Sequence, residues 1–148
     1  MKLVRYGEKG SEKPGLIDGD GTLRDLSAHV SDIDGSTLGE DSLAKLRALD
    51  ASGLPAVGGS PRLGCPVGSI GKVRCIGLKF SDHAKESNLP IPEEPILFMK
   101  ATTSLNGPND QVVLPKGSVK SDWEVELGIV IGKRASYVEE ADALDYVA

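Results

Sequence analysis

The chain has 148 residues and a mass of 15.5 kDa, enough for one domain with a hydrophobic core of its own. Its 22 acidic residues outnumber the 17 basic ones for a formal charge of −5, and no basic stripe occurs, which argues against a nucleic-acid partner. With 18 glycines, 9 prolines and only 4% aromatic residues, the composition favours strands and turns over a helical bundle.

The two cysteines and the N-terminus indicate the compartment. Cys65 and Cys75 do not form a Cys-x-x-Cys pair, and two thiols make no disulfide framework, so both are expected to be reduced. No apolar run approaches the ~18 residues that a membrane span requires. Residues 1–6 lack the apolar core of a signal peptide. A cytoplasmic protein without a membrane partner is therefore expected.

The first third of the chain is expected to form small β-structure. Residues 2–6 alternate apolar and polar side chains, as an edge strand does. Two short apolar runs, 15–17 and 22–26, flank the sequence Asp-Gly-Asp-Gly at 18–21. Asp-Gly between such runs is a hairpin signal, because glycine adopts positive φ at little cost, so we predict a β-hairpin here.

A short helix and a connector are expected to follow the hairpin. Leucines recur at threefold spacing within residues 43–50, which predicts a helix with Asp41 or Ser42 as its N-cap. The run Ser-Pro-Arg-Leu-Gly-Cys-Pro at 60–66 is typical of a connector.

The second domain, residues 69–148, is expected to follow an N-terminal subdomain of residues 1–68 and to be β-rich. Its apolar runs predict four strands and a closing helix, with the strands at 73–78, 96–99, 112–114 and 123–132 and the helix at 139–146. Prolines at 90–95 predict an extended loop. Four strands do not close a barrel, so a partner or more chain is expected to complete this mixed, β-rich α+β fold.

Glu124 and Glu126 form the first candidate site. Alternate residues of a strand share a face, so both carboxylates are expected to point the same way, about 7 Å apart. The apolar Gly-Ile-Val-Ile run that follows predicts a strand buried on both faces. Two carboxylates in a buried region repel and lose hydration, and a hard divalent cation with oxygen ligands offsets both effects. The alternative is an ordinary solvent-facing pair, and a complete metal site needs further oxygens or waters.

His83 and Glu86 form the second candidate site. They lie three positions apart, so they share one face if the segment forms a helical turn. A carboxylate beside an imidazole orients it and raises its basicity, which suits activation of a water. The alternative is an exposed histidine on a surface turn. Lys100 either meets an anionic substrate or simply ends a strand, and Arg74 and Lys79 have the same ambiguity.

These segments occur together in the order typical of one enzyme family. Four runs together resemble the fumarylacetoacetate hydrolase family: CIGLKFSDHAKE at 75–86, PILFMK at 95–100, GPND at 107–110 and DWEVELGIVIGK at 122–133. The opening, with KLVRYG at 2–7 and RDLSAHV at 24–30, resembles the bacterial branch, often described as ureidoglycolate lyases or hydrolases of 2,4-diketo-3-deoxy sugar acids. The resemblance covers essentially the whole chain, and the Glu-x-Glu and His-x-x-Glu blocks are specific together and weak alone.

The resemblance implies a fold, a cofactor and residue roles. Family catalytic domains form a mixed β-roll with few helices, usually as dimers, and this chain would carry the first part of that roll. A magnesium or manganese ion is held by the residues that match Glu124 and Glu126, and a third acidic ligand is expected beyond Ala148. His83 and Glu86 match a pair that lies on a lid over the substrate and activates water, and Lys100 matches a lysine near the site.

Two departures from the family pattern matter. The family's Gly-Leu-Asn-Tyr before the dyad is Gly-Leu-Lys-Phe at 77–80, which puts the contact of the tyrosine hydroxyl with substrate or lid in question. Family chains are also much longer, so this chain is expected to be the N-terminal half of a full-length protein that forms a homodimer.

Three functions follow as hypotheses. The leading one is a divalent-metal-dependent hydrolase that cleaves a C–C bond in a 2,4-diketo or acylpyruvate-type keto acid. The second keeps the same residues but acts as a ureidoglycolate lyase, an isomerase or a decarboxylase. The third is a catalytically incomplete fragment, in which the 148-residue chain is inactive because the third metal ligand is missing.

Overall fold

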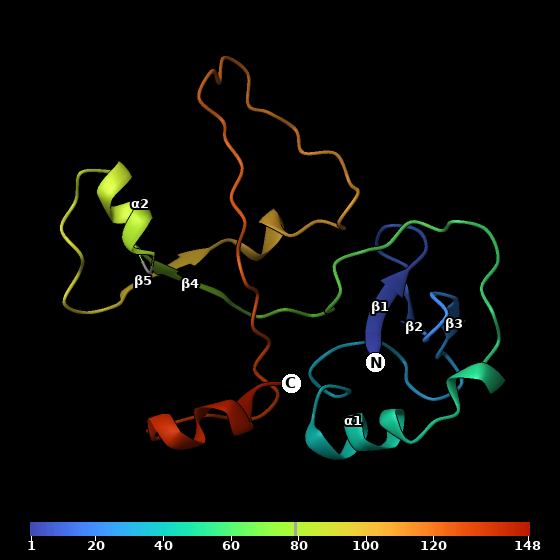
Figure 1. The fold of residues 1–148 in the computed structure, drawn as a ribbon. Helices are drawn as coiled ribbons and strands as arrows, with labels where there is room; N and C mark the ends of the chain where they lie inside the picture. The colour runs from blue at the N-terminus through green and yellow to red at the C-terminus, as the bar shows by residue number, and fades with distance from the viewer. Residues whose placement is uncertain (79) are drawn as a thin grey trace. The chain divides into compact units, whose positions relative to one another are not determined.

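Residues 1–78 and 80–148 are described by the computed structural model of the chain (Figure 1). They form two units. Unit 1 contains residues 1–69 and 106–148, and unit 2 contains residues 70–105. Each unit is described by itself below. The expected division of the chain at residue 68 stays a prediction.

Unit 1 begins with a three-stranded antiparallel sheet. Its strands are β1 (Lys2–Tyr6), β2 (Lys13–Ile17) and β3 (Leu23–Asp25), in the order β1-β2-β3. The β2–β3 turn forms where Asp-Gly-Asp-Gly predicts it: Gly21 has φ +82°, and Oδ1 of Asp18 accepts hydrogen bonds from the backbone N–H groups of Asp20 and Thr22. The edge strand and the hairpin predicted from the sequence are therefore confirmed.

The predicted helix forms three residues earlier than expected. Helix α1 spans Glu40–Arg47, and the short 3₁₀ helix η1 (Ala51–Gly53) follows it. The N-cap is Gly39, neither Asp41 nor Ser42, and its carbonyl accepts the first helical hydrogen bond from the N–H of Leu43 at 2.9 Å. The early start places acidic side chains in the first turn, where the helix dipole favours negative charge.

The hydrophobic core of unit 1 lies between the sheet and α1. Leu26 and Ile33 are its most completely buried large side chains, and the other buried members are Leu16, Leu38, Leu43, Leu46 and Leu54. The leucines that predicted α1 thus form the side of the helix that packs on the core. This burial anchors α1, which carries no side-chain N-cap bond.

Unit 2 is built on a two-stranded antiparallel sheet. Strand β4 (Val73–Gly77) pairs with β5 (Ile96–Lys100), helix α2 (Ser81–Glu86) and the loop after it lie between them, and the 3₁₀ helix η2 (Thr102–Ser104) follows β5. Both strands are where the sequence predicts them. The apolar run at 96–99 also predicts a buried strand, and this part of the prediction is wrong: Leu97 and Met99 are each 57% exposed, because two strands cover neither face of such a small sheet.

Two further strand predictions are also wrong. Residues 112–114 and 123–132 form no strand, and only one isolated bridge, between Ile131 and Val147, involves this part of the chain. A strand needs a hydrogen-bonded neighbour, and no ladder partner faces these residues within the described chain. The predicted closing helix is the 3₁₀ helix η3 (Glu140–Tyr146).

The overall class is the expected mixed one, with two small sheets and short helices. Among the helices of the described residues, none combines the length and the apolar character needed to cross a bilayer.

Candidate functional site

Helix α2 positions the His83–Glu86 pair. Its six residues place both side chains on one face, and both are exposed, whereas Ala84 on the opposite side is 1% exposed. The helix ends firmly: Asn88 takes the left-handed conformation with φ +51°, and the N–H of Leu89 bonds to the carbonyl of Ala84 at 2.9 Å. The helical turn on which the dyad depends is therefore present, while its catalytic role stays a prediction.

The β4–β5 sheet places Lys100 in the same unit as the dyad. Lys100 is the last residue of β5, pairs in register with Val73 and is exposed. Arg74 lies in β4, opposite Met99. Lys79, the third basic candidate, lies outside the described residues.

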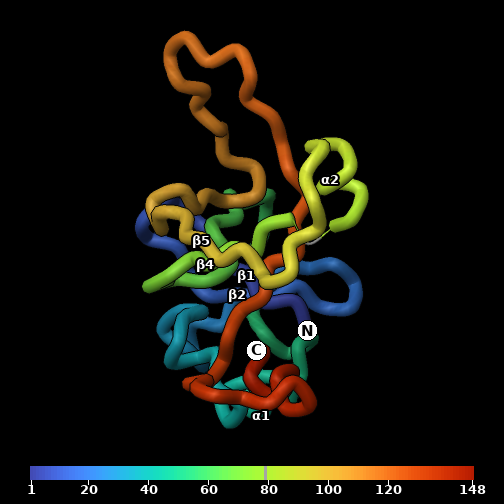
Figure 2. Tube along the Cα trace, turned by 90° about the vertical axis from the view of Figure 1, so that its left-hand side faces the viewer, coloured from blue at the N-terminus to red at the C-terminus, as the bar shows by residue number. Residues whose placement is uncertain are grey.

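Glu124 and Glu126 lie in unit 1, on the segment 111–130, which we call the arm. The arm is the long orange loop of Figures 1 and 2. Both glutamates are exposed, and the expectation of a buried strand around them is wrong: Trp123 and Val125 are 78% and 79% exposed. The apolar side chains that indicated burial have no described sheet to pack against.

The candidate metal pair fits a hard cation in its donor type. Both side chains are carboxylates, and oxygen ligands are what magnesium and manganese prefer. Within the described residues, however, no group of three or more His, Cys, Asp or Glu side chains comes together to hold a metal ion. The two carboxylates alone are fewer donor groups than such an ion needs.

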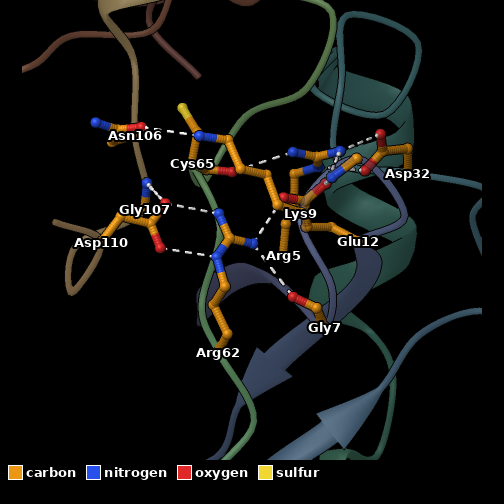
Figure 3. A network of polar contacts seen from close by, with 11 residues as sticks. Arg5, Gly7, Lys9, Glu12, Asp32, Arg62, Cys65, Asn106, Gly107 and Asp110 are labelled. Carbon is orange, nitrogen blue, oxygen red and sulfur yellow. Dashed lines mark hydrogen bonds and ion pairs between the residues drawn. The ribbon is translucent and has the colours of Figure 1, made fainter.

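A polar network missing from the sequence-based prediction lies in unit 1 (Figure 3). The guanidinium of Arg62 donates to Asp110 through Nε and Nη2, both at 2.7 Å, and to Glu12 through Nη1 at 2.8 Å. The guanidinium of Arg5 holds Asp32 in the same two-bond manner, at 2.6 and 3.0 Å. Nothing in the sequence indicated that Arg62 pairs with Asp110, 48 residues away.

Hydrogen bonds within this network shift the pKa values of Asp110, Glu12 and Arg5. Hydrogen bonding from Arg62 lowers the pKa of Asp110 to about 2 and also lowers the pKa of Glu12. The hydrogen bond to Asp32 raises the pKa of Arg5. Asp110, Glu12 and Arg5 are therefore ionised at neutral pH, and charge-assisted bidentate bonds of this kind are the strong ones in proteins.

Comparison with known proteins places this architecture. The family model described as "Fumarylacetoacetate (FAA) hydrolase C-terminal" matches residues 72–148. The chain therefore belongs to the fumarylacetoacetate hydrolase family. The matched region contains His83, Glu86, Lys100, Glu124 and Glu126.

Curated relatives agree with this assignment. Proteins of Burkholderia lata and Burkholderia multivorans, both named "Putative hydrolase", are 57% and 58% identical to the chain over all its 148 residues. The alignments cover 52% of each relative, so the chain spans about half the length of the curated relatives it matches.

Solved structures support the fold. A structure described as a "putative HpcE protein" from Mycobacterium smegmatis superposes on 100% of the chain with a TM-score of 0.76 and 29% identity, using 52% of its own length. The fumarylacetoacetate hydrolase of Exiguobacterium antarcticum superposes on 99% of the chain with a TM-score of 0.74 and 24% identity, again with 52% of its length covered. The latter likeness shows the shared fold alone.

Proposed function

We propose that the chain carries the catalytic residues of a divalent-metal-dependent hydrolase that cleaves a C–C bond in a 2,4-diketo or acylpyruvate-type acid. The observation that carries the proposal is the helical turn of α2, which puts His83 and Glu86 on one solvent-facing side within the family-matched region. Glu124 and Glu126 would hold Mg²⁺ or Mn²⁺. When bound, such an ion supplies a positive charge that polarises a substrate carbonyl.

In this proposal, His83, Glu86 and Lys100 carry out the other steps of the reaction. The imidazole of His83 takes a proton from a water molecule, whose oxygen bonds to the substrate carbonyl carbon. The carboxylate of Glu86 orients the imidazole and stabilises its charged form. The C–C bond then breaks, and its electron pair goes to the departing carbon, which takes up the proton held by His83. The ammonium of Lys100 offsets the charge of the substrate carboxylate.

Thermal melting with manganese tests the metal part of this proposal. A ligand at 100 times its dissociation constant adds about 2.7 kcal/mol to the stability of the chain, which shifts the midpoint by several degrees. Millimolar Mn²⁺ is expected to raise the melting midpoint of the unsubstituted chain and to leave the melting midpoint of the Glu124→Gln variant unchanged. Glu139→Gln, which removes an exposed glutamate elsewhere in unit 1, is the matched control and is expected to keep the shift.

The dyad is tested separately. His83→Ala is expected to abolish hydrolysis of an acylpyruvate by the full-length protein while it keeps the manganese shift. Turnover that survives this substitution contradicts the role given to His83. If manganese leaves the melting midpoint of the unsubstituted chain unchanged, the role given to Glu124 and Glu126 in this chain is contradicted.

A further inference from the structure

Two chain segments of unit 1 lie side by side where the chain departs for unit 2 and where it returns. Residues 62–65 precede the departure after Ser69, and residues 106–110 follow the return. We call these two segments the neck. Both segments belong to unit 1. Figure 3 shows the contacts between them.

Arg62 joins the two sides of the neck. Its two-bond contact with Asp110 links the outgoing segment to the returning one, and its bonds to Glu12 and to the carbonyl of Gly7 link both to the β1–β2 connection. Asp110 also accepts a 2.9 Å bond from the N–H of Gly107, which closes the turn on its own side. One guanidinium thus joins three stretches of chain.

The backbones of the neck are in direct contact as well. Gly107 is buried, and a Cβ at this position would lie 2.2 Å from the carbonyl oxygen of Leu63. The N–H of Gly64 bonds to the carbonyl of Arg5 in β1 at 2.8 Å, so the outgoing side is tied to the sheet. The neck is therefore joined to the β1–β2–β3 sheet through β1.

Every candidate catalytic residue lies on a segment that starts or ends at this neck. The excursion between its two sides carries His83, Glu86 and Lys100, and the arm that begins after Asp110 carries Glu124 and Glu126. The far end of the arm is tied separately, by the hydrogen bonds from Gly132 to Tyr146 and from Ala148 to Val130, both 2.8 Å.

We propose that Arg62 is a positioning residue, which fixes the common origin of the two segments that carry the candidate catalytic groups. The proposal rests on the proposed function, because it assigns Arg62 a part in holding the metal-binding glutamates in place. Two carboxylates bind one cation together only when the arm adopts a single geometry around it, with water molecules completing the coordination. An arm that is tied at both ends loses less conformational entropy when it adopts this geometry.

The size of the effect follows from the length of the flexible stretch. With the neck closed, the stretch between the two ties is the arm itself. With the neck open, the stretch also includes residues 65–72 and 101–110, since the β4–β5 pairing still joins residue 73 to residue 100, and it is about twice as long. Closure probability falls with the 3/2 power of length, so opening the neck is expected to weaken metal binding by about threefold.

The test uses Trp123, the single tryptophan of the chain, as a reporter beside Glu124. Mn²⁺ is paramagnetic and quenches the fluorescence of a nearby indole, so titration with MnCl₂ gives a dissociation constant without any activity assay. Arg62→Gln is expected to raise that constant about threefold, and Glu124→Gln is expected to abolish the quenching.

A matched ion pair of unit 1 supplies the control. Arg24 bonds to Asp18 at 2.7 Å and to the carbonyl of Leu54 at 3.2 Å, is similarly half-buried, and lies outside the neck. Arg24→Gln is expected to lower the melting temperature about as much as Arg62→Gln while it leaves the manganese constant unchanged. An Arg62→Gln chain that binds manganese as tightly as the unsubstituted chain overturns the positioning role.

A second readout separates failure of this proposal from failure of the proposed function. Hydrogen exchange at the N–H of Gly107 reports the neck itself, and Arg62→Gln is expected to speed it at least tenfold, whereas Arg24→Gln leaves it unchanged. If the unsubstituted chain shows no manganese quenching, the metal part of the proposed function fails. The exchange rate of the Gly107 amide then tests the role of Arg62 by itself. A rate that Arg62→Gln leaves unchanged contradicts the role of Arg62 in closing the neck, and a faster rate supports it.

Discussion

The ring of Tyr6 in β1 passes over Gly15 in β2, and its hydroxyl donates a 2.5 Å hydrogen bond to Oδ2 of Asp25 in β3. This bond spans the whole width of the small sheet. Burial, and then the bond to Asp25, raise the pKa of Tyr6 to about 12, and the same bond lowers the pKa of Asp25. The pair therefore couples the stability of unit 1 to pH at both ends of the scale.

The first prediction concerns that pH dependence. Because the pKa of Tyr6 is raised, its contribution to stability is fully present below the unfolded pKa near 10 and is lost as pH rises towards about 12. Because the pKa of Asp25 is lowered, its contribution is present above the unfolded pKa near 4 and is lost as pH falls below that value. Tyr6→Phe is expected to cost ~1–2 kcal/mol at pH 7 and progressively less above pH 10. Urea unfolding of both chains at pH 7 and 11 measures the difference, and a difference independent of pH contradicts the coupling.

The second prediction concerns the close approach at Gly15. A Cβ there would lie 2.9 Å from the carbonyl oxygen of Arg24 and 3.0 Å from the Tyr6 ring. Because one of these neighbours is backbone, Gly15→Ala is expected to destabilise the chain by ~1–3 kcal/mol. Gly35→Ala, where a Cβ meets nothing within 4 Å, is expected to change stability by less than ~0.5 kcal/mol. Equal melting temperatures for the two variants would contradict this packing.

The third prediction concerns the neck. At Gly107 the added Cβ would lie 2.2 Å from a backbone oxygen, too close for any side-chain rearrangement to relieve. Gly107→Ala is expected to cost at least ~2 kcal/mol and to separate residues 106–110 from Leu63. Chemical shifts of the Gly64 and Asp110 amides measure that separation, and unchanged shifts in a folded Gly107→Ala chain count against it.

The fourth prediction concerns acid. Because Arg62 lowers the pKa of Asp110 to about 2, the bond between them persists at pH values where ordinary carboxylates are protonated. The contribution of Asp110 to stability is present above its unfolded pKa near 4 and is lost as pH falls towards 2. The amide of Gly107, which bonds to Asp110, is expected to titrate with a midpoint near pH 2 in a proton–nitrogen NMR titration. A midpoint near 4 would mean that the carboxylate is not held by Arg62.

The fifth prediction concerns the helix that carries the dyad. Asn88 ends α2 with a positive φ, a conformation that costs a β-branched residue about 1–2 kcal/mol and glycine almost nothing. Asn88→Val is expected to loosen α2, and Asn88→Gly to preserve it. Hydrogen exchange at Ser87 and Leu89, whose amides close the helix end, distinguishes the two; equal protection in both variants excludes Asn88 as the stop.

Much of the local structure could be predicted from the sequence. The β2–β3 hairpin follows from the Asp-Gly turn, and β4 and β5 follow from their apolar runs. The helical turn of His83 and Glu86 was a condition of the dyad that the sequence did not itself predict, and α2 meets it. The start of α1 was missed because Gly39 caps it without any side-chain bond, so no capping residue marks the position.

What the sequence alone determined, then, is what neighbouring residues decide among themselves: turns, short strands, one helical turn and the family to which the chain belongs. The tertiary structure decided the contacts between distant residues, such as Arg62 with Asp110 and Tyr6 with Asp25, because pairing two charged or polar side chains depends on how the intervening backbone folds back. It also decided that residues 123–132 form no strand, since a strand exists only where a second one supplies its hydrogen bonds.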